Sequence, residues 1–313
     1  MIDRPIDGLL VIDKPAGPTS HDVVSRARRA LREKRIGHTG TLDPLATGVL
    51  ALVIGKATRL APFLSASDKE YEATVRLGTA TDTYDALGRP ASSGSTPVAE
   101  IDAAHIQRAL ARFHGTFEQM PPPFSAKKIA GVPAYKLARK QKDVALAAVP
   151  VTVHSIELLE LASGAARLRM TTSAGFYVRS LAHDLGAALG CGGHLEALRR
   201  TRAGRFGLDR AVPLEALEQN PEVAISQIVP VSDVLPELPS IRLTDAGAER
   251  AAHGNFLTPQ DFADTGPVPA FATDAANRET DPVRVRVMDA EGRLLAIATA
   301  GPDGVLRPSV VLV

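Results

Sequence analysis

Apolar residues along the chain form short runs and alternations, which predict strands, and helical stripes, which predict helices. The continuous apolar run at residues 49–54 is typical of a buried strand. From Tyr71 to Leu77 every second residue is apolar, which predicts a half-buried strand. The strands expected before residue 180 are 8–12, 49–54, 70–77, 149–159 and 166–172.

Three segments carry their apolar residues at helical spacing. The apolar residues of segment 20–31 fall on one face of a helix that Ser20 is expected to cap. A second helix is expected at residues 101–113, and a third at 176–189, where a glycine cluster ends it. Because strands and helices mix without a regular strand–helix–strand alternation, we predict an α+β fold with a mixed sheet.

A proline-rich segment divides the chain. Residues 230–239 contain three prolines, which is typical of a domain boundary. Beyond it the pattern predicts a helix at 243–253 and a β-hairpin at 283–299, whose turn is Asp-Ala-Glu-Gly. We therefore predict a larger domain at residues 1–235 and a small, mainly β domain at 240–313.

Composition narrows the class of protein. The 313 residues, 45% of them hydrophobic, suffice for one large and one small domain. No apolar run approaches membrane-spanning length, and no signal peptide is recognisable. A single cysteine, Cys191, excludes an internal disulfide and fits a reducing cytoplasm, where we expect the protein to work. Cys191 and the eight histidines show no metal-binding spacing, so no metal site is expected.

The net charge is only +1, but the basic residues are unevenly distributed. They concentrate at residues 26–35, at 127–142 and at 199–205, where Arg199, Arg200, Arg202 and Arg205 follow closely. Basic runs are commonly solvated faces, yet three of them flank segments with candidate chemistry. This arrangement favours a phosphate-binding surface and a nucleic-acid partner.

The most informative segment is residues 37–50, where Asp43 is the one acid among glycines, threonines and a proline. Gly37, Gly40 and Gly48 allow backbone conformations closed to other residues, and Pro44 fixes the backbone after the acid. Such a loop can present one carboxylate for chemistry. Loop composition alone supports equally well an Asp43 that caps the turn before the next strand.

The run Gly-His-Thr-Gly-Thr-Leu-Asp-Pro-Leu-Ala-Thr-Gly-Val-Leu resembles the catalytic motif of the TruB family of tRNA pseudouridine synthases. That family isomerises uridine 55 in the T-loop of tRNA. The resemblance implies a pseudouridine synthase fold with a central mixed, mostly antiparallel sheet. It also implies that Asp43 is the catalytic residue.

Two further segments resemble family motifs. Lys69-Glu70-Tyr71 resembles a Lys-x-Tyr motif, whose tyrosine stacks on the target base and is placed to act at C5. Residues 173–181 resemble the segment whose arginine, here Arg179, pairs with the catalytic aspartate. A helix-borne arginine among apolar neighbours needs a buried partner, and a bidentate pair with Asp43 would keep Asp43 ionised.

The same resemblance implies a set of substrate-binding residues. His38 matches a residue that fills the space left by the flipped nucleotide, and Tyr177 matches one that lines the uracil pocket. Lys14, in a Lys-Pro motif, supports the site. The full set comprises His38, Tyr177, Lys14, Gly40, Thr41 and Leu198.

RNA-binding parts outside the site are implied as well. Residues 121–148 resemble an RNA-gripping insertion, and residues 241–313 look like a PUA-type RNA-binding domain. The implied partner is tRNA, contacted at the T-arm and the acceptor end, with no guide RNA, obligate protein partner or membrane. Breaking the N1–C1′ bond and rejoining uracil through C5 involves no redox change, so no cofactor is expected.

Several alternatives stay open at this point. Asp43 can add to C1′ of the ribose or remove a proton from C2′. The guide-RNA-dependent branch of the superfamily shares the aspartate loop, although this chain lacks a long basic tail. A tRNA-folding chaperone role can exist beside the enzyme activity or in its place, and an intact Asp43, Tyr71 and Arg179 set argues against the latter.

Overall fold

The computed structural model describes residues 6–92, 96–124, 128–129, 132–133, 146–263, 283–301 and 303–313. Most of the predicted insertion at 121–148, and the side chains of the basic cluster at 127–142, lie outside these residues. Within the described part, no helix combines the length and apolarity needed to cross a membrane. The same residues contain no cluster of three metal-ligating side chains.

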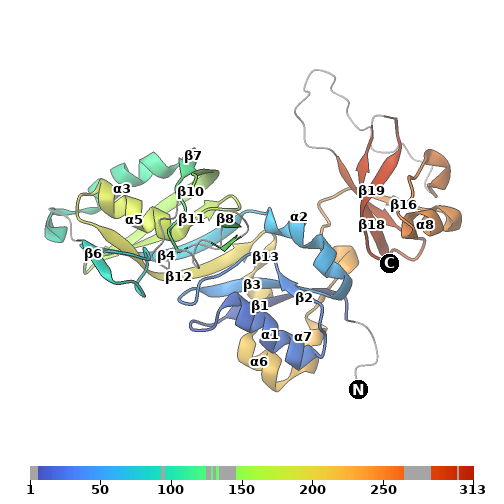
Figure 1. Cartoon of the computed structure of the whole chain (residues 1–313), viewed down its shortest axis with the longest axis horizontal. Helices are drawn as coiled ribbons and strands as arrows, with labels where there is room; N and C mark the ends of the chain where they lie inside the picture. Colours follow the sequence, from blue (N-terminus) through green and yellow to red (C-terminus); the bar gives the residue numbers. More distant parts are fainter. Residues whose placement is uncertain are drawn as a thin grey trace.

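One 11-stranded sheet forms the body of the molecule (Figure 1). Its strands are β1 (Gly8–Lys14), β2 (Ile36–His38), β3 (Thr47–Ile54), β4 (Lys69–Leu77), β7 (Gly115–Gln119), β10 (Val149–Ala162), β11 (Ala165–Thr172), β12 (Gly193–Ala203), β13 (Phe206–Gly207), β14 (Val212–Pro213) and β15 (Val229–Pro230). The main order is β14-β1-β3-β12-β4-β11-β10-β7, with β2, β13 and β15 paired to β3, β12 and β1. Only the β1–β14 and β3–β12 pairs are parallel, which confirms a mixed, mostly antiparallel sheet.

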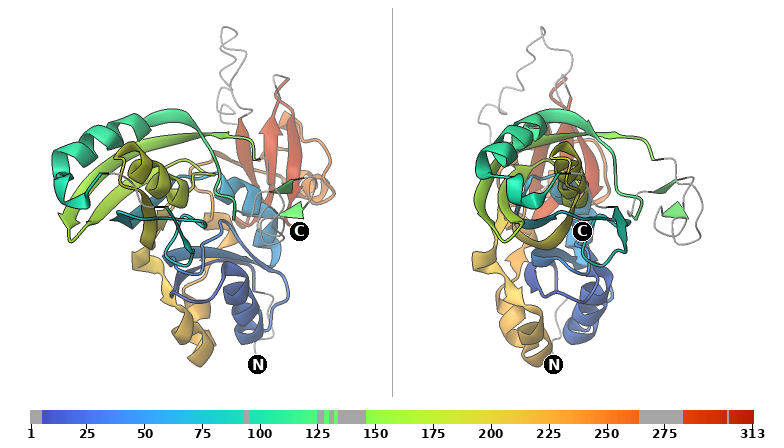
Figure 2. Two further views of the ribbon diagram at one scale, coloured as in Figure 1. Left: turned by 60° about the vertical axis from the view of Figure 1, so that its left-hand side comes forward. Right: turned by 90° about the vertical axis from the view of Figure 1, so that its left-hand side faces the viewer.

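Helices cover the two halves of this sheet separately (Figures 1 and 2). The helices of the body are α1 (Ser20–Leu31), α2 (Ala61–Ser65), α3 (Ala103–Leu110), α5 (Val178–Ala188), α6 (Leu214–Gln219) and α7 (Pro221–Ser226). α3 packs on β10, and α5 on β12 and β4, whereas α1, α6 and α7 pack together beside β1. The 3₁₀ turns are Gly55–Leu60, Val98–Glu100, Ala111–Phe113, Leu208–Arg210, Val231–Asp233 and Pro259–Asp261. Two short strand pairs stand apart from the main sheet: β5 (Ala80–Thr81) with β6 (Pro90–Ser92), and β8 (Lys128–Ile129) with β9 (Val132–Pro133).

A four-stranded sheet follows at the C-terminal end, in the order β16-β17-β18-β19 (Figure 2). It consists of β16 (Ser240–Arg242), β17 (Arg284–Met288), β18 (Leu294–Ala300) and β19 (Leu306–Val311), with helix α8 (Asp245–Ala252) beside it. β17 and β18 form the predicted antiparallel hairpin. The sequence pattern did not reveal the two edge strands, β16 and β19.

Strands β1 and β3 are buried on both faces, as their continuous apolar runs predicted. Leu10 and Leu50 belong to the core that α1 and α5 cover. Leu9 and Val11, on the opposite face, share a second core with Ile297 of the C-terminal sheet. β19 contacts the 3₁₀ turn Gly55–Leu60, which follows β3. The C-terminal sheet is therefore joined through this second core to β3, the strand that follows residues 39–46, which we call the Asp43 loop.

Two sequence-based expectations need correction. The N-cap of α1 is Thr19, whose side chain accepts from the Asp22 N–H, and Ser20 is the first helical residue. No strand was expected at residues 193–203, where the sequence analysis noted only Leu198 and the basic residues from 199 on. This segment is the central strand β12, along part of which buried and partly exposed positions alternate. β4 keeps the predicted alternation, with Tyr71 and Leu77 on its buried face.

Gly48 allows β3 and β12 to lie close together. Its φ is +98°, and a Cβ built there would lie 2.2 Å from the carbonyl oxygen of Arg200. Both the backbone conformation and the close approach therefore require glycine. The Asp43 loop depends on this junction, because Gly48 follows the loop by only a few residues.

We predict that Gly48→Ala lowers the free energy of unfolding by about 2–5 kcal/mol, from a strained backbone and an overlap with β12. Gly17→Ala is the matched control, because Gly17 also has a positive φ of +107° but no atom within 4 Å of a built Cβ. The control is expected to lose only about 1–2 kcal/mol, the backbone contribution. Equal losses of unfolding free energy in the two variants, measured by urea unfolding, would show that the close approach of Arg200 does not exclude a side chain at position 48.

Candidate active site

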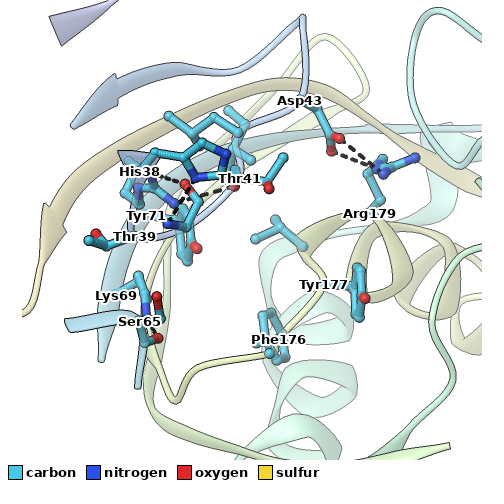
Figure 3. A pocket seen from close by; sticks show the side chains of 16 residues that line it. His38, Thr39, Thr41, Asp43, Ser65, Lys69, Tyr71, Phe176, Tyr177 and Arg179 are labelled. Carbon is cyan, nitrogen blue, oxygen red and sulfur yellow. Dashed lines mark hydrogen bonds and ion pairs between the residues drawn. The ribbon is translucent and has the colours of Figure 1, made fainter. Parts of the chain in front are cut away.

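A cavity of about 390 Å³ opens where β12 and β4 meet the Asp43 loop and the N-terminus of α5 (Figure 3). All but one of the predicted site residues line it: His38, Gly40, Thr41, Asp43, Tyr71, Tyr177, Arg179 and Leu198. The exception is Lys14, which lies behind the loop. Residues separated by more than a hundred positions in sequence thus meet around one cavity.

Arg179 and Asp43 form the bidentate ion pair that the sequence predicted. The Nε of Arg179 lies 2.8 Å from Oδ2 of Asp43, and its Nη2 donates to Oδ1 at 3.1 Å. The Arg179 side chain is 8% exposed, whereas that of Asp43 is 32% exposed. The arginine is thus the buried anchor, and the carboxylate is the partner that reaches the cavity (Figure 3).

Arg179 also contacts two other segments of the chain. Its Nη1 donates to the carbonyl of Thr83 at 3.2 Å and lies 3.6 Å from a carboxylate oxygen of Asp85. Its Nη2 donates to the carbonyl of Phe124 at 3.0 Å. One guanidinium therefore joins three segments and two carboxylates. Sequence analysis missed Asp85, although Asp85 also lies in a short Thr/Asp-rich run.

Polar side chains from α1 and β1 hold the backbone of the Asp43 loop. The Ser20 hydroxyl accepts from the N–H of Leu42 at 2.8 Å and donates to its carbonyl at 3.0 Å. The buried Lys14 ammonium donates to the carbonyl of Ala46 at 2.7 Å and to that of Pro44 at 3.4 Å. Ser20 thus holds the loop and does not cap α1. Lys14 has the supporting position that the family resemblance implied.

The turn at Asp43 is closed by the backbone and not by the carboxylate. The Asp43 carbonyl accepts from the N–H of Ala46 at 3.0 Å, while the carboxylate faces Arg179. The Asp43 side chain therefore does not cap the turn, which was the alternative that loop composition left open.

Arg200 is an exception to the phosphate-binding surface expected from the cluster at 199–205. Its side chain is buried and donates to the carbonyls of Val49 at 2.7 Å and Gly40 at 3.0 Å. Arg199 pairs with Asp13 at 2.8 Å. A buried guanidinium that binds backbone carbonyls supports the loop and is not free to meet a phosphate.

Two tyrosines and a histidine form the walls of the cavity (Figure 3). Tyr71 is 8% exposed and reaches the cavity from β4. The buried amide of Gln119 holds the backbone of Tyr177, accepting from its N–H at 2.8 Å and donating to its carbonyl at 3.0 Å. Nδ1 of His38 accepts from the N–H of Gly40 at 3.3 Å. Gln119 carries no sequence motif that could have revealed this contact.

Known proteins are similar in sequence to this chain over most or all of its length. Residues 28–178 match the family model of the TruB family pseudouridylate synthase N-terminal domain, and residues 179–232 match that of the tRNA pseudouridylate synthase B C-terminal domain. The tRNA pseudouridine synthase B of Solibacter usitatus is 43% identical over 309 residues, 98% of this chain and 100% of the relative. That of Aromatoleum aromaticum is 50% identical over 255 residues, 81% of this chain and 82% of the relative.

The chain belongs to the TruB family.

Solved structures support the same fold. A Cbf5-Nop10-Gar1 complex contains a chain with a TM-score of 0.72 and 26% identity, covering 99% of this chain and 88% of the other. A chain in the structure of an H/ACA RNP bound to a substrate RNA has a TM-score of 0.70 and 24% identity, and the match covers 99% of this chain and 88% of the other. The predicted pseudouridine synthase fold is thereby confirmed. The TruB family models end at residue 232, before the four-stranded C-terminal sheet begins.

The electrostatics of this TruB family site depend on burial. Burial raises the pKa of the Asp43 carboxyl above its ordinary value, Arg179 opposes this shift, and the carboxylate of Asp85 adds to it. Burial also lowers the pKa of Lys14 to about 8, while the nearby Asp43 partly restores it. Cationic groups thus surround an acid that is poorly solvated.

Two other groups on the cavity wall are shifted by burial. Burial lowers the pKa of Lys69 to about 8, and the positive charge of Arg200 adds to this effect. The ammonium of Lys69 donates to the carbonyls of Ser65 and Ser67, which tie the start of β4 to the end of α2. Burial lowers the pKa of His38 below 6.5, which favours a neutral ring at pH 7.

We predict that Asp85→Asn shifts the acid limb of the pH–rate profile to lower pH. The catalytic role that the family resemblance implies for Asp43 needs its ionised form, and removal of the Asp85 charge removes one of the causes that raise the Asp43 pKa. The asparagine side chain retains an oxygen that can accept from the Leu87 N–H, as the Asp85 carboxylate does. Asp82→Asn, in the same loop but exposed, is the control and is expected to leave the limb in place. A limb that does not move would contradict electrostatic coupling between Asp85 and Asp43.

We also predict that Arg179→Met lowers the free energy of unfolding by about 3–5 kcal/mol, because two carboxylates lose their buried partner. Asp43→Asn keeps the shape of the side chain and removes one of those charges. The two substitutions together are expected to cost less than the sum of their separate costs. Additive losses in a double-mutant cycle would contradict a stabilising Asp43–Arg179 contact.

Proposed function

We propose that this TruB family member is a tRNA pseudouridine-55 synthase, which isomerises the T-loop uridine of tRNA in the cytoplasm. The observation that carries the proposal is the Asp43–Arg179 pair at the edge of a cavity walled by Tyr71 and Tyr177. A carboxylate held by a buried cation, beside aromatic rings that can stack on a base, suits chemistry on a flipped nucleotide.

The target uridine reaches the cavity by leaving its stack, which costs a few kcal/mol. The Tyr71 ring stacks on the extruded uracil, and Tyr177 lines the pocket beside it. His38 fills the space that the nucleotide vacates. The stiff backbone of the Asp43 loop matters here, because the carboxylate must meet the ribose with little further movement.

Asp43 acts at the ribose. Two routes satisfy the balance of bonds: addition of the carboxylate to C1′ as the N1–C1′ bond breaks, or removal of the C2′ proton to leave a glycal. After uracil has turned, C5 bonds to C1′. In the first route the Asp43–C1′ bond breaks as this bond forms, and in the second C2′ takes back the proton held by Asp43. The C5 proton is then lost, a step we assign to the Tyr71 hydroxyl, and N1, freed from the ribose, gains a proton. Neither route consumes an oxidant, a reductant or an activated donor.

RNA contacts outside the cavity are assigned by charge and by chain organisation. We place the catalytic domain at residues 1–235, with an RNA-gripping insertion at 121–148, and a PUA-like RNA-binding domain at 240–313. The T-arm meets the catalytic domain, and the acceptor end meets the C-terminal domain. Arg29 and Arg32 on α1 and its C-cap are exposed and can meet phosphates, in contrast to Arg200.

Action without a guide RNA or an obligate protein partner is part of the proposal. Relatives named tRNA pseudouridine synthase B share 42–50% identity with this chain, whereas the chains in the H/ACA and Cbf5 structures share 24–26%. This difference favours the stand-alone type. The experiment below adds nothing but protein and RNA.

The test is incubation of unmodified tRNA with the purified protein alone, followed by mapping of pseudouridine along the RNA. Pseudouridine at position 55, and none in a tRNA with cytidine there, is the expected result. A T-arm stem-loop is the minimal substrate. Modification at another position, or only after a second RNA is added, would overturn the assignment.

We predict that Asp43→Asn abolishes single-turnover conversion and leaves tRNA affinity within about threefold, since the substitution preserves shape and removes the reacting charge. A filter-binding assay on the same preparation measures the affinity. Asp82→Asn, which also neutralises one acid, is the control for net charge. Single-turnover conversion within tenfold of the unaltered protein would exclude Asp43 as the catalytic residue.

A further inference from the structure

The loop that carries Asp85 onto Arg179 connects β5 and β6, and we call residues 82–89 the Asp85 loop. Its own shape is fixed locally. The Thr81 hydroxyl donates to the carbonyl of Asp85 at 2.7 Å, and the Asp82 carboxylate accepts from the N–H of Arg89 at 2.8 Å. These contacts shape the hairpin but do not place it against helix α5, where Arg179 lies.

Tyr84, between the two residues that contact Arg179, has an unusual backbone. Its φ is +65°, a left-handed conformation that is unfavourable for an aromatic residue. Hydrogen bonds from Leu195 N–H to the Tyr84 carbonyl and from Ala86 N–H to the Leu195 carbonyl, both 2.9 Å, hold this conformation against β12. A side chain kept at a strained position is a reason to ask what that side chain does.

The Tyr84 ring stacks on the ring of His183, with centroids 3.8 Å apart and planes 11° from parallel. His183 is on α5, four residues after Arg179, so both side chains project from the same side of the helix. The buried Nδ1 of His183 makes no hydrogen bond within the described residues. The contribution of this histidine to the loop is therefore the face of its ring.

We propose that Tyr84 and His183 are a positioning pair for the Asp43–Arg179 site. The stack fixes the Asp85 loop to α5 one turn from Arg179. The carbonyl of Thr83 and the carboxylate of Asp85 then meet Nη1 of Arg179 and keep the Nε and Nη2 edge turned to Asp43. Neither residue of the pair touches the cavity, so each acts through Arg179.

The experiment compares Tyr84→Gly with Tyr84→Phe. Glycine accepts the positive φ and removes the ring, whereas phenylalanine keeps the ring. For Tyr84→Gly we expect kcat on tRNA to fall on the order of tenfold or more, since small misplacements of reacting groups are costly, with KM within about twofold. Tyr84→Phe is expected to restore kcat.

Three further variants separate the effect of stacking from that of backbone strain. His183→Ala removes the other ring, and its combination with Tyr84→Gly is expected to lower kcat no further than either change alone. Ser163 also has a positive φ, of +51°, in the turn between β10 and β11. Ser163→Gly relieves strain away from the cavity and is expected to leave kcat unchanged.

A spectroscopic readout does not depend on turnover. The Nε–H signal of Arg179 in ¹⁵N spectra should be observable while the ion pair with Asp43 holds, and should broaden in Tyr84→Gly and His183→Ala but not in Tyr84→Phe. Only the kinetic arm rests on the proposed function. If the wild-type protein were inactive on tRNA, the proposed function would be refuted. The Arg179 signal would then still test whether Tyr84 and His183 position Arg179.

Three results would overturn the positioning pair. They are an unchanged Arg179 signal in both ring-deleting variants, a kcat for both variants within twofold of the active wild type, and a Tyr84→Phe variant as impaired as Tyr84→Gly. His183→Ala, which does not change the strained backbone, decides the question if Tyr84→Gly fails to fold.

Discussion

The buried guanidinium of Arg179 is the constraint on which the rest of the site depends. A guanidinium removed from water must be met by acceptors at nearly all of its N–H groups, because an unpaired buried charge is strongly destabilising. Here the acceptors come from the Asp43 loop, the Asp85 loop and the carbonyl of Phe124. Folding therefore cannot satisfy Arg179 without also assembling the cavity, and the Asp43 carboxylate is placed by the same contacts that stabilise the arginine.

A second constraint concerns the backbone of the Asp43 loop. This loop belongs to no strand, so its carbonyls lack ladder partners, and Lys14 and Arg200 supply the donors. Both cations are buried, and burial lowers the pKa of Lys14 to about 8. Of these two cations, Lys14 also acts on Asp43: together with Arg179 it favours the ionised carboxylate against the effect of burial.

The C-terminal sheet is tied to this arrangement through packing. Ile297 and Leu312 share a core with Leu9 and Val11 on the back of β1, and Arg59 donates to the carbonyl of Val311. β1 in turn pairs along its full length with β3, which leaves the Asp43 loop. A change at the C-terminal sheet can therefore alter the stability of the strands beneath the active site without touching a cavity residue.

The sequence by itself determined the features whose cause is local. Alternation from Tyr71 to Leu77 predicted β4, the apolar runs predicted β1 and β3, and the lone acid in a glycine-rich loop marked Asp43. The arginine among apolar neighbours predicted a buried partner. Tertiary structure alone decided that Asp85 shares that arginine, that Arg200 binds backbone carbonyls and not phosphate, and that Ser20 holds a loop and not a helix end. These roles rest on contacts between residues far apart in the chain, and a charged or hydroxyl side chain has the same local pattern whether its partner is water or a carbonyl brought near by the fold.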